Sequence, residues 1–477
     1  MTRMSSDLWE QVPPEAQVIF LEMAQTIKRL EQRVCELEAR LGMTPQNSSL
    51  PPSSQHPHAK GPHAKGAKAK RATKSKSKRK RGGQPGHKKH ERALVPLDEV
   101  QEIIVLRPSS CRRCGEGLLG EDTQPWRQQV WEMPEIKPII TEYQRQRLIC
   151  ACCGTSTCAA LPSGVPAHQS GPRLTAFVAL LMAHFRQSKR RVGLFCQSVL
   201  NIPCSTGLAV KLQRRATLAL RGAYDELAQL LPAQQVLGID ESPTRQANHK
   251  AWLWTFVADE FTLFRVTESR KADILDELLT SNFAGIVTCD RAKMYFRLPR
   301  LQWCWAHLKR DFQALAECGV SVAQNLARKL LVHTQRLFRQ WTRCRDGTIT
   351  PRGLKSSLGQ TRREVERLLL RGLRCRHRKT SGLCQELLHH RDRLWTFLDH
   401  DNVEPTNNAS ERALRHAVIW RKLSFGTQSC AGSRFVETLL SVIETCRQQN
   451  RDVFAFVTNS IQHHLAHQPP PSLLPGP

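Results

Sequence analysis

Five short apolar runs between residues 235 and 305 constrain the fold of this chain more than any other feature. Each run has the length and composition of a β-strand. A helical segment, Ala272–Leu279, separates the third run from the fourth. The five runs are Gln235–Ile239, Trp252–Ala258, Thr262–Thr267, Gly285–Thr288 and Leu301–Trp305. We therefore expect a sheet of these strands, with helices after the fourth strand and the fifth.

Acidic residues follow two of these strands. Asp240 follows the first strand, and Asp290 follows the fourth after Cys289. Three strands, a helix, and then alternating strands and helices form the element order of a ribonuclease H-like domain. In that order the first and fourth strands are neighbours. We therefore expect the two carboxylates to meet, although 50 residues separate them in the sequence.

A third acid is expected from a helix after the sheet. The segment TNNASERALRHAVIW opens with Thr406, Asn407 and Asn408, all of which are favourable N-cap residues. Glu411 then falls in or near the first turn, from which its side chain can project towards the two aspartates.

Three such carboxylates suit phosphodiester chemistry. Mg²⁺ prefers hard oxygen ligands, and two ions about 3.5–4 Å apart can stabilise both the attacking and the leaving oxygen. We predict that Asp240, Asp290 and Glu411 are catalytic and hold two Mg²⁺ or Mn²⁺ ions per active site. From spacing alone, surface ion pairing is an alternative, and three other acids compete for these roles, namely Glu241, Asp259 and Glu404.

Two matching cysteine pairs predict a structural zinc site. The sequences CRRCG and CACCG each place two cysteines before a glycine, where a tight turn can aim both sulfurs at one ion. The predicted ligands are Cys111, Cys114, Cys150 and Cys153, with Cys152 and Cys158 as alternatives. The other interpretation is that these are ordinary buried cysteines. Without a secretory signal, the 17 cysteines of the chain indicate thiols rather than disulfides.

The charge balance predicts a polyanionic partner. The chain has 71 Lys and Arg against 42 Asp and Glu, a formal net charge of +29, and nucleic acid is the commonest partner of such a protein. The segment 60–92 holds 14 Lys and Arg and one acid, so it is expected to be disordered when free and to neutralise phosphates. The alternative is a solvated tail. The DNA-binding residues predicted in the segment 60–92 are Lys78, Arg79, Lys80, Arg81, Lys88 and Lys89.

The N-terminal segment predicts self-association. Apolar residues alternate at steps of three and four, which is typical of a short coiled coil. A helix packed on its own protein is the alternative. The repeating positions are Phe20, Met23, Ile27, Leu30, Val34, Leu37 and Leu41.

Residues 163–232 are expected to be helical. A turn at Asn201–Pro203, followed by Ser205 or Thr206 as a cap, resembles a helix-turn-helix. Its second helix would carry Lys211, Arg214 and Arg215 towards DNA, and plain helical packing is the alternative.

Membrane insertion and secretion are not expected. The longest apolar candidate, Thr175–Ala183, is far shorter than the roughly 20 residues of a spanning helix. The N-terminus has no basic start followed by an apolar core, so no secretory signal is predicted.

Several blocks resemble the insertion-sequence 66 family of DDE (Asp-Asp-Glu) transposases. The resemblance covers nearly the whole chain, including NSSLPPSS, RGGQPGHKKH and the paired cysteine knuckles. The family's acidic blocks are similar to GIDESPTRQANHKAWLWTF, CDRAKMY and EPTNNASERALRHAVIWRKLSFGTQSCAGSRFVETLLSVIETC. These blocks place Asp240, Asp290 and Glu411. Departures are Arg291–Met294 before Tyr295, and Ser242 where threonine is frequent.

The resemblance also implies supporting features. WCWAHLKRDF is similar to a Cys-x-x-His block, here Cys304 and His307, a pair too small for a closed zinc site and expected to support the fold. Asn407 and Asn408 are expected to support the third acid, and Arg421 and Lys422 to contact phosphate, although Arg421 could be an ordinary surface charge. A basic helical insertion, with 18 Lys and Arg and five acids over 321–395, could clamp DNA.

The predicted fold class is multidomain α+β, with a coiled coil, a zinc-binding module, a helical DNA-binding region and a ribonuclease H-like α/β catalytic domain interrupted by a helical insertion. The expected boundaries are 1–43 (coiled coil), 44–92 (basic arm), 93–162 (zinc module), 163–232 (helical DNA-binding region), 233–311 and 399–466 (catalytic domain), 312–398 (insertion) and 467–477 (disordered tail).

The predicted function is a transposase that binds the terminal repeats of an insertion sequence and catalyses metal-dependent strand cleavage and strand transfer. Its expected partners are element and target DNA, a second copy of itself and small accessory proteins of the same element. Its expected place is the bacterial cytoplasm, at the nucleoid. The alternatives are a catalytically decayed DNA-binding protein and a ribonuclease H-like nuclease or resolvase.

Overall fold

The computed structural model describes residues 12–41, 43, 92–280 and 282–474. Contacts divide the chain into two units, His58–Pro138 and the remainder. The predicted basic arm, 44–92, lies outside the described residues except for Arg92, as does the start of the predicted coiled-coil segment. None of the helices in the described ranges has the length and apolarity needed to cross a membrane.

A mixed five-stranded sheet forms the centre of the larger unit. Its order is β5-β4-β3-β6-β7, with β3 antiparallel to β4 and parallel to β6. The prediction that the first and fourth strands are neighbours in the sheet is therefore confirmed. All four residues of β6 are buried, as expected for a central parallel strand covered on both faces. The strands are β3 (Val236–Gln246), β4 (His249–Val257), β5 (Thr262–Thr267), β6 (Ile286–Cys289) and β7 (Arg300–Trp303).

The first strand is longer than its apolar run predicts. The prediction that it ends before Asp240 is wrong, because β3 continues to Gln246. Its second half is polar and pairs with β4 across a tight hairpin, in which Ala247 and Asn248 have positive φ values of 48° and 65°. Hydrogen bonding to β4 therefore extends the strand beyond the point where burial ends.

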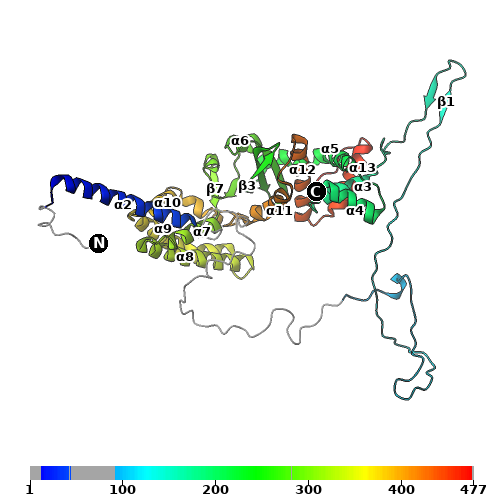
Figure 1. The fold of residues 1–477 in the computed structure, drawn as a ribbon, viewed down its shortest axis with the longest axis horizontal. Coiled ribbons are helices and arrows are strands. Elements are labelled where there is room, and N and C mark those ends of the chain that lie inside the picture. The colour runs from blue at the N-terminus through cyan, green and yellow to red at the C-terminus, as the bar shows by residue number, and fades with distance from the viewer. Residues whose placement is uncertain (1–11, 42, 44–91, 281, 475–477) are drawn as a thin grey trace. The chain divides into compact units, whose positions relative to one another are not determined.

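Helices cover the sheet and form a second group beside it (Figure 1). Helix α11 (Asn408–Ser424) packs on β3 and β4, and α12 (Cys430–Gln448) packs on β5. Beyond α12, four helices pack together with the long helix α5 at their centre. The Tyr224 hydroxyl of α5 donates a hydrogen bond to the Phe264 carbonyl of β5 at 2.9 Å. These four are α3 (Pro172–Ala183), α4 (Lys189–Leu200), α5 (Thr206–Leu230) and α13 (Val453–Leu465).

The predicted helical insertion is present after β7. Its consecutive helices pack in pairs, α7 on α8, α8 on α9, and α9 on α10. Their bounds are α7 (Trp305–Ala316), α8 (Ser321–Arg345), α9 (Pro351–Leu373) and α10 (Arg378–His389). Short helices fill the connections, namely α6 (Asp273–Leu279), which matches its prediction, and the 3₁₀ turns η3 (Leu97–Glu99), η4 (Leu231–Ala233), η5 (Lys293–Arg297), η6 (Arg391–Leu394) and η7 (Thr396–Leu398).

The N-terminal segment is helical, as α2 (Pro14–Leu41). Its described apolar side chains at the repeating positions are exposed: Phe20, Met23, Ile27, Leu30 and Val34. An exposed apolar seam agrees with the pattern of a coiled coil, but the structure holds one chain, so self-association remains a prediction.

The described part of the C-terminal tail is packed against the protein, whereas the sequence predicts a disordered tail. Residues 467–474 pack against α5, with Leu473 fully buried and the Ser472 hydroxyl bonded to Glu226 at 2.8 Å. Arg451 also donates to the Leu473 carbonyl at 3.2 Å. Two leucines among the prolines give this short segment enough apolar surface to dock, which its composition alone concealed.

Candidate active site

Asp240 and Asp290 lie at the same end of the ladder between β3 and β6. The parallel ladder between β3 and β6 ends at the pair Gly238 and Thr288. Each aspartate stands two residues beyond this pair, because Asp240 follows Gly238 on β3 and Asp290 follows β6. Backbone amides orient both side chains, since Glu241 N–H donates to Asp240 Oδ1 at 3.0 Å and Ala292 N–H donates to Asp290 Oδ1 at 2.8 Å.

The third predicted acid, Glu411, lies in the first turn of α11. Asn407 fixes that turn on the sheet, because its side-chain amide donates to the Ile239 carbonyl at 2.7 Å, directly before Asp240. Asn407 occupies the N-cap position of α11, but its side chain binds β3 and does not cap the helix. Asn408 is exposed at the start of α11.

Negative charge surrounds Asp240. Desolvation by the surrounding protein raises the pKa of the Asp240 carboxyl well above its usual range, and the carboxylates of Glu241, Asp290 and Glu411 raise it further. A nearby like charge raises a carboxyl pKa because it disfavours the ionised form. Asp290 and Glu411 thus lie within electrostatic range of Asp240, and the site around Asp240 favours a positive ion.

The competing acids have other surroundings. Glu241 is 3% exposed and pairs with Arg270, whose Nε lies 2.8 Å from Oε1, while the Tyr295 hydroxyl donates to Oε2. Asp259 and Glu404 instead line a polar cavity of about 1020 Å³ beside the beginning of β3. Glu241 is thereby neutralised within the fold, and the other two line that cavity.

The acids fit a hard divalent cation by charge and by chemistry. They are carboxylate oxygens crowded at one sheet edge, and the Oε1 atom of Glu411 is buried without a hydrogen-bond partner among the described residues. The carboxylate oxygens of the triad do not all lie within 4.8 Å of one another. In the described part of the chain, that spacing is found for Cys304, His307 and Glu411. Ligands of two ions about 3.5–4 Å apart can span a wider gap.

Cys304 and His307 lie directly beside the third acid. The Cys304 sulfur accepts a hydrogen bond from the Asn407 backbone amide at 3.2 Å, so it joins the beginnings of α7 and α11. His307 Nδ1 lies 3.7 Å from Glu411 Oε1. Burial lowers the pKa of His307, which favours the neutral imidazole, and burial raises the pKa of the Cys304 thiol to about 11.

Sequence reasoning missed two arginines near the site. Arg310 Nη2 lies 3.6 Å from Glu411 Oε2. Arg291, directly after Asp290, binds Asp311 of α7 at 2.7 Å and Glu386 of α10 at 2.6 Å, so it ties the loop after β6 to these two helices. Arg310 could have been found by extending the three-residue spacing of Cys304 and His307 one further turn along the same helix face.

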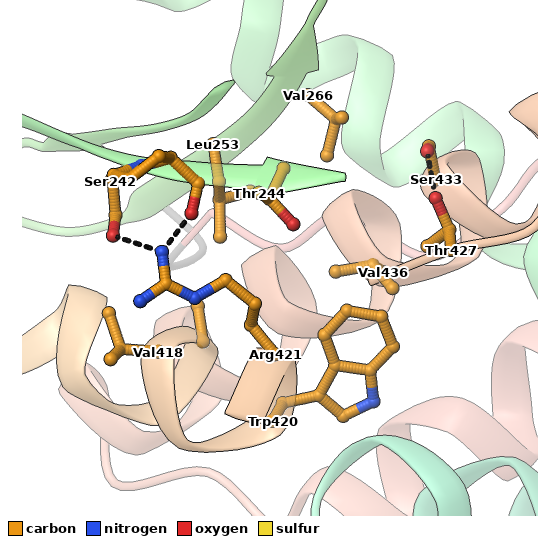
Figure 2. Close-up of a pocket in the computed structure, with 12 residues that line it drawn as sticks. Ser242, Thr244, Leu253, Val266, Val418, Trp420, Arg421, Thr427, Ser433 and Val436 are labelled. Carbon is orange, nitrogen blue, oxygen red and sulfur yellow. Dashed lines mark hydrogen bonds between the residues drawn. The ribbon is translucent and has the colours of Figure 1, made fainter. Parts of the chain in front are cut away.

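Arg421 has an internal role that differs from the predicted phosphate contact. Its Nη1 donates to the Ser242 hydroxyl at 3.1 Å and to the Pro243 carbonyl (Figure 2). Burial lowers the pKa of its guanidinium. Arg421 therefore fastens α11 to β3, while the neighbouring Lys422 is exposed and its DNA contact remains a prediction.

The two cysteine knuckles have the same backbone turn. Cys111 N–H bonds to the Glu116 carbonyl at 2.8 Å, and Cys150 N–H bonds to the Thr155 carbonyl at 2.9 Å. The glycine of each knuckle has a positive φ, +79° at Gly115 and +70° at Gly154, which only glycine adopts readily. Each knuckle thus has the predicted tight turn.

Hydrogen bonding favours the thiolate form in both knuckles. Backbone amides of Cys114 and Arg113 lower the pKa of Cys111, and the Thr155 hydroxyl and amide lower the pKa of Cys153. A thiolate is the form that binds metal. The first knuckle belongs to the unit His58–Pro138 and the second to the other unit, so the shared four-cysteine site stays a prediction. Of the alternative ligands, Cys152 is exposed and Cys158 ends β2 (Ser156–Cys158), which pairs with β1 (Arg147–Ile149).

Helices α4 and α5 are joined by a short turn, at the positions expected for a helix-turn-helix. Asn201 ends α4 with a φ of 55°, and the Ser205 hydroxyl caps α5 by accepting from Leu208 N–H at 3.1 Å. Lys211 and Arg214 are exposed on α5, and Arg215 is half-buried. Contact of these three residues with DNA remains a prediction, as does contact by the basic arm.

Comparison with known proteins decides the family. The sequence model of the Transposase IS66 family matches residues 168–434, which is more than half of the 477 residues. The chain belongs to the IS66 transposase family. The match extends from before α3 into α12, so it includes the sheet, the insertion and all three acids. Membership in this family supports a transposase role and implies DNA binding.

The chain has two further similarities. Residues 6–93 match a family of unknown function. An uncharacterized protein of Sinorhizobium fredii, y4qI, is 23% identical over 409 residues, which cover 76% of this chain and 72% of the relative.

Proposed function

We propose that this IS66 family member cleaves the ends of an insertion sequence and joins them to target DNA, with Asp240, Asp290 and Glu411 as its catalytic residues. The observation that carries the proposal is that Asp240 and Asp290 lie at the same end of the β3–β6 ladder, while Asn407 bonds the beginning of α11, which carries Glu411, to Ile239. In so basic a chain, ion pairs with Lys or Arg could have neutralised these acids. In the described part of this site, however, the acid with a close ion pair is Glu241, which binds Arg270.

The chain's own residues would position the reaction. Asp240, Asp290 and Glu411 would hold divalent ions, which supply charge stabilisation to the attacking and leaving oxygens of a phosphodiester. The amides of Glu241 and Ala292 keep the two aspartates in a fixed orientation. Arg291 would hold the Asp290 loop in register with the insertion. Such preorganised positioning is the main catalytic means available for phosphoryl transfer.

Both steps exchange one phosphorus–oxygen bond for another. In cleavage, water attacks the phosphodiester at the element boundary and the 3′-oxygen leaves as a hydroxyl. In joining, that 3′-hydroxyl attacks a target phosphodiester and displaces the target 3′-oxygen. One set of carboxylates can therefore serve both steps. The coiled-coil helix α2 would pair two protomers, so that both element ends are held together.

The test is a cleavage and joining assay on DNA that carries the ends flanking the gene. We expect Asp240→Asn, Asp290→Asn and Glu411→Gln each to abolish cleavage while DNA binding survives. Asp259→Asn is the matched control, because this exposed acid lies at the cavity beside the beginning of β3, and it should keep activity. Retained cleavage in any of the three variants would refute the assignment, and wild-type protein that binds but does not cut would indicate a decayed transposase.

A further inference from the structure

Three ligand groups of different chemistry meet where α7 and α11 begin. They are the Cys304 sulfur, a nitrogen of His307 and a carboxylate oxygen of Glu411, which all lie within 4.8 Å of one another. Cys304 directly precedes α7, and His307 follows within the first turn of that helix. Glu411 comes from the first turn of α11. The cluster therefore joins two segments that are far apart in the sequence.

Two atoms of the cluster are buried and unpaired. His307 Nδ1 and Glu411 Oε1 face each other at 3.7 Å, and neither has a hydrogen-bond partner in the part of the chain that the structure describes. That distance exceeds the 2.7–3.2 Å of an ordinary N–H···O hydrogen bond. In a tetrahedral zinc site with bonds near 2.0–2.1 Å, a nitrogen and an oxygen ligand lie about 3.3 Å apart. The observed gap is thus too long for a direct bond and close to the edge of a metal tetrahedron.

Neighbouring residues orient two of these side chains. Glu411 Oε2 lies 3.6 Å from Arg310 Nη2, so this arginine offsets one carboxylate oxygen and leaves Oε1 turned towards His307. The Asn407 amide donates to the Cys304 sulfur at 3.2 Å and thereby holds it beside the beginning of α11. The cluster is therefore oriented by neighbours that do not fill its centre.

We propose that Cys304, His307 and Glu411 form a binding site for a borderline-soft divalent cation of the zinc class. Sulfur, nitrogen and oxygen together suit Zn²⁺ or Co²⁺, whereas Mg²⁺ prefers oxygen alone. Three protein ligands leave a fourth position for water. Binding replaces the Cys304 S–H bond with a sulfur–metal bond and releases that proton to solvent.

Sharing of Glu411 gives the site a regulatory consequence, which rests on the proposed function. Glu411 is also one of the three acids assigned to the catalytic ions. A zinc ion that holds Oε1 would draw this carboxylate towards α7, so Zn²⁺ should inhibit Mg²⁺-dependent cleavage. The inhibition should be weaker in Cys304→Ser than in the wild type.

The direct test uses Co²⁺ alone as a spectroscopic probe, without DNA. The full chain would carry serine at all six cysteines of the knuckle region, so that the knuckles contribute no second site. These are Cys111, Cys114, Cys150, Cys152, Cys153 and Cys158. We expect a near-ultraviolet sulfur-to-cobalt charge-transfer band that Cys304→Ser abolishes and that His307→Gln shifts to Co²⁺ concentrations on the order of 100-fold higher. Cys446→Ser, which removes an equally buried thiol of α12, is the matched control and should keep the band.

The outcomes separate this site from the catalytic one. Asp240→Asn should abolish cleavage yet keep the cobalt band. No band in the parent protein, or a band that survives Cys304→Ser, would overturn the metal site and leave the catalytic assignment intact. Circular dichroism establishes that each variant is folded, and His307→Gln provides the same test if Cys304→Ser does not fold.

Discussion

Gly238 of β3 lies directly beneath Ser410 of α11. A β-carbon at position 238 would stand 2.4 Å from the Ser410 hydroxyl oxygen and 3.2 Å from Asn407 Oδ1. The absence of a side chain therefore lets the first turn of α11 rest on β3 two residues before Asp240. This close approach sets the separation between Asp240 and Glu411.

Gly238→Ala should disturb the active site. The new methyl group must push α11 outward, because overpacking is relieved by shifts of backbone or side chains, at about 1–3 kcal/mol of stability. We expect at least about a tenfold loss of cleavage, since small misplacements of catalytic groups are costly. Adding Ser410→Ala removes the closest clash and should restore most activity, because the Ser410 hydroxyl is buried without a hydrogen-bond partner among the described residues. Wild-type cleavage by Gly238→Ala alone would contradict this role of the glycine.

Arg421→Ala tests whether this arginine stabilises the packing of α11 on β3 or contacts DNA. Loss of its bonds to Ser242 and Pro243 should lower the unfolding free energy by about 1–2 kcal/mol. The slope of log affinity against log salt should stay unchanged, whereas Lys422→Ala should reduce it by about one if Lys422 binds phosphate. Equal slope changes in both variants would show that Arg421 also reaches DNA.

Zinc analysis tests the four-cysteine prediction. If Cys111, Cys114, Cys150 and Cys153 share one ion, then Cys111→Ser and Cys150→Ser should each remove the same ion. The double variant should lose no more zinc than either single variant. Plasma emission spectrometry of purified protein measures this directly. Additive losses would indicate that each knuckle binds its own ion, with other ligands completing the sites.

Glu437→Ala should destabilise the helical cover of the sheet. The fully buried Glu437 of α12 accepts from Val266 N–H at 3.0 Å, and Arg434 Nε lies 2.8 Å from its Oε1. Removing the carboxylate leaves the Val266 amide without this acceptor and takes the counter-charge from Arg434, at about 3 kcal/mol in urea unfolding. Glu437→Gln keeps an acceptor for Val266 and should cost less. Equal losses in the two variants would rule out the Val266 hydrogen bond as the cause.

The pH dependence of stability follows from the same residue. Burial raises the pKa of the Glu437 carboxyl, so the folded protein keeps a proton at pH values where the unfolded chain has released it. That contribution is complete below the usual carboxyl pKa and is lost as pH rises through the raised value. Glu437→Gln cannot titrate, so a plot of its unfolding free energy against pH should be flatter in this window. Identical pH profiles for the variant and the wild type would show that Glu437 does not retain its proton on folding.

Local patterns determined the elements of this protein. The five apolar runs predicted the strands, and the order of the elements along the chain predicted that the first and fourth strands are neighbours. Ser205 and Asn201 marked the turn between α4 and α5. The N-cap sequence before Glu411 placed that acid in the first turn of its helix. These signals are readable because periodicity, capping and turn formation depend on residues a few positions apart.

Tertiary structure alone decided which of these residues meet. The hairpin with β4 put Asp240 inside a strand, and the docking of α11 on β3 gave Arg421 an internal role. The same docking set Glu411 beside His307, although 104 residues separate them. No local pattern carries such a contact, because it depends on distant backbone groups finding partners, as when the Asn407 amide bonds to Cys304.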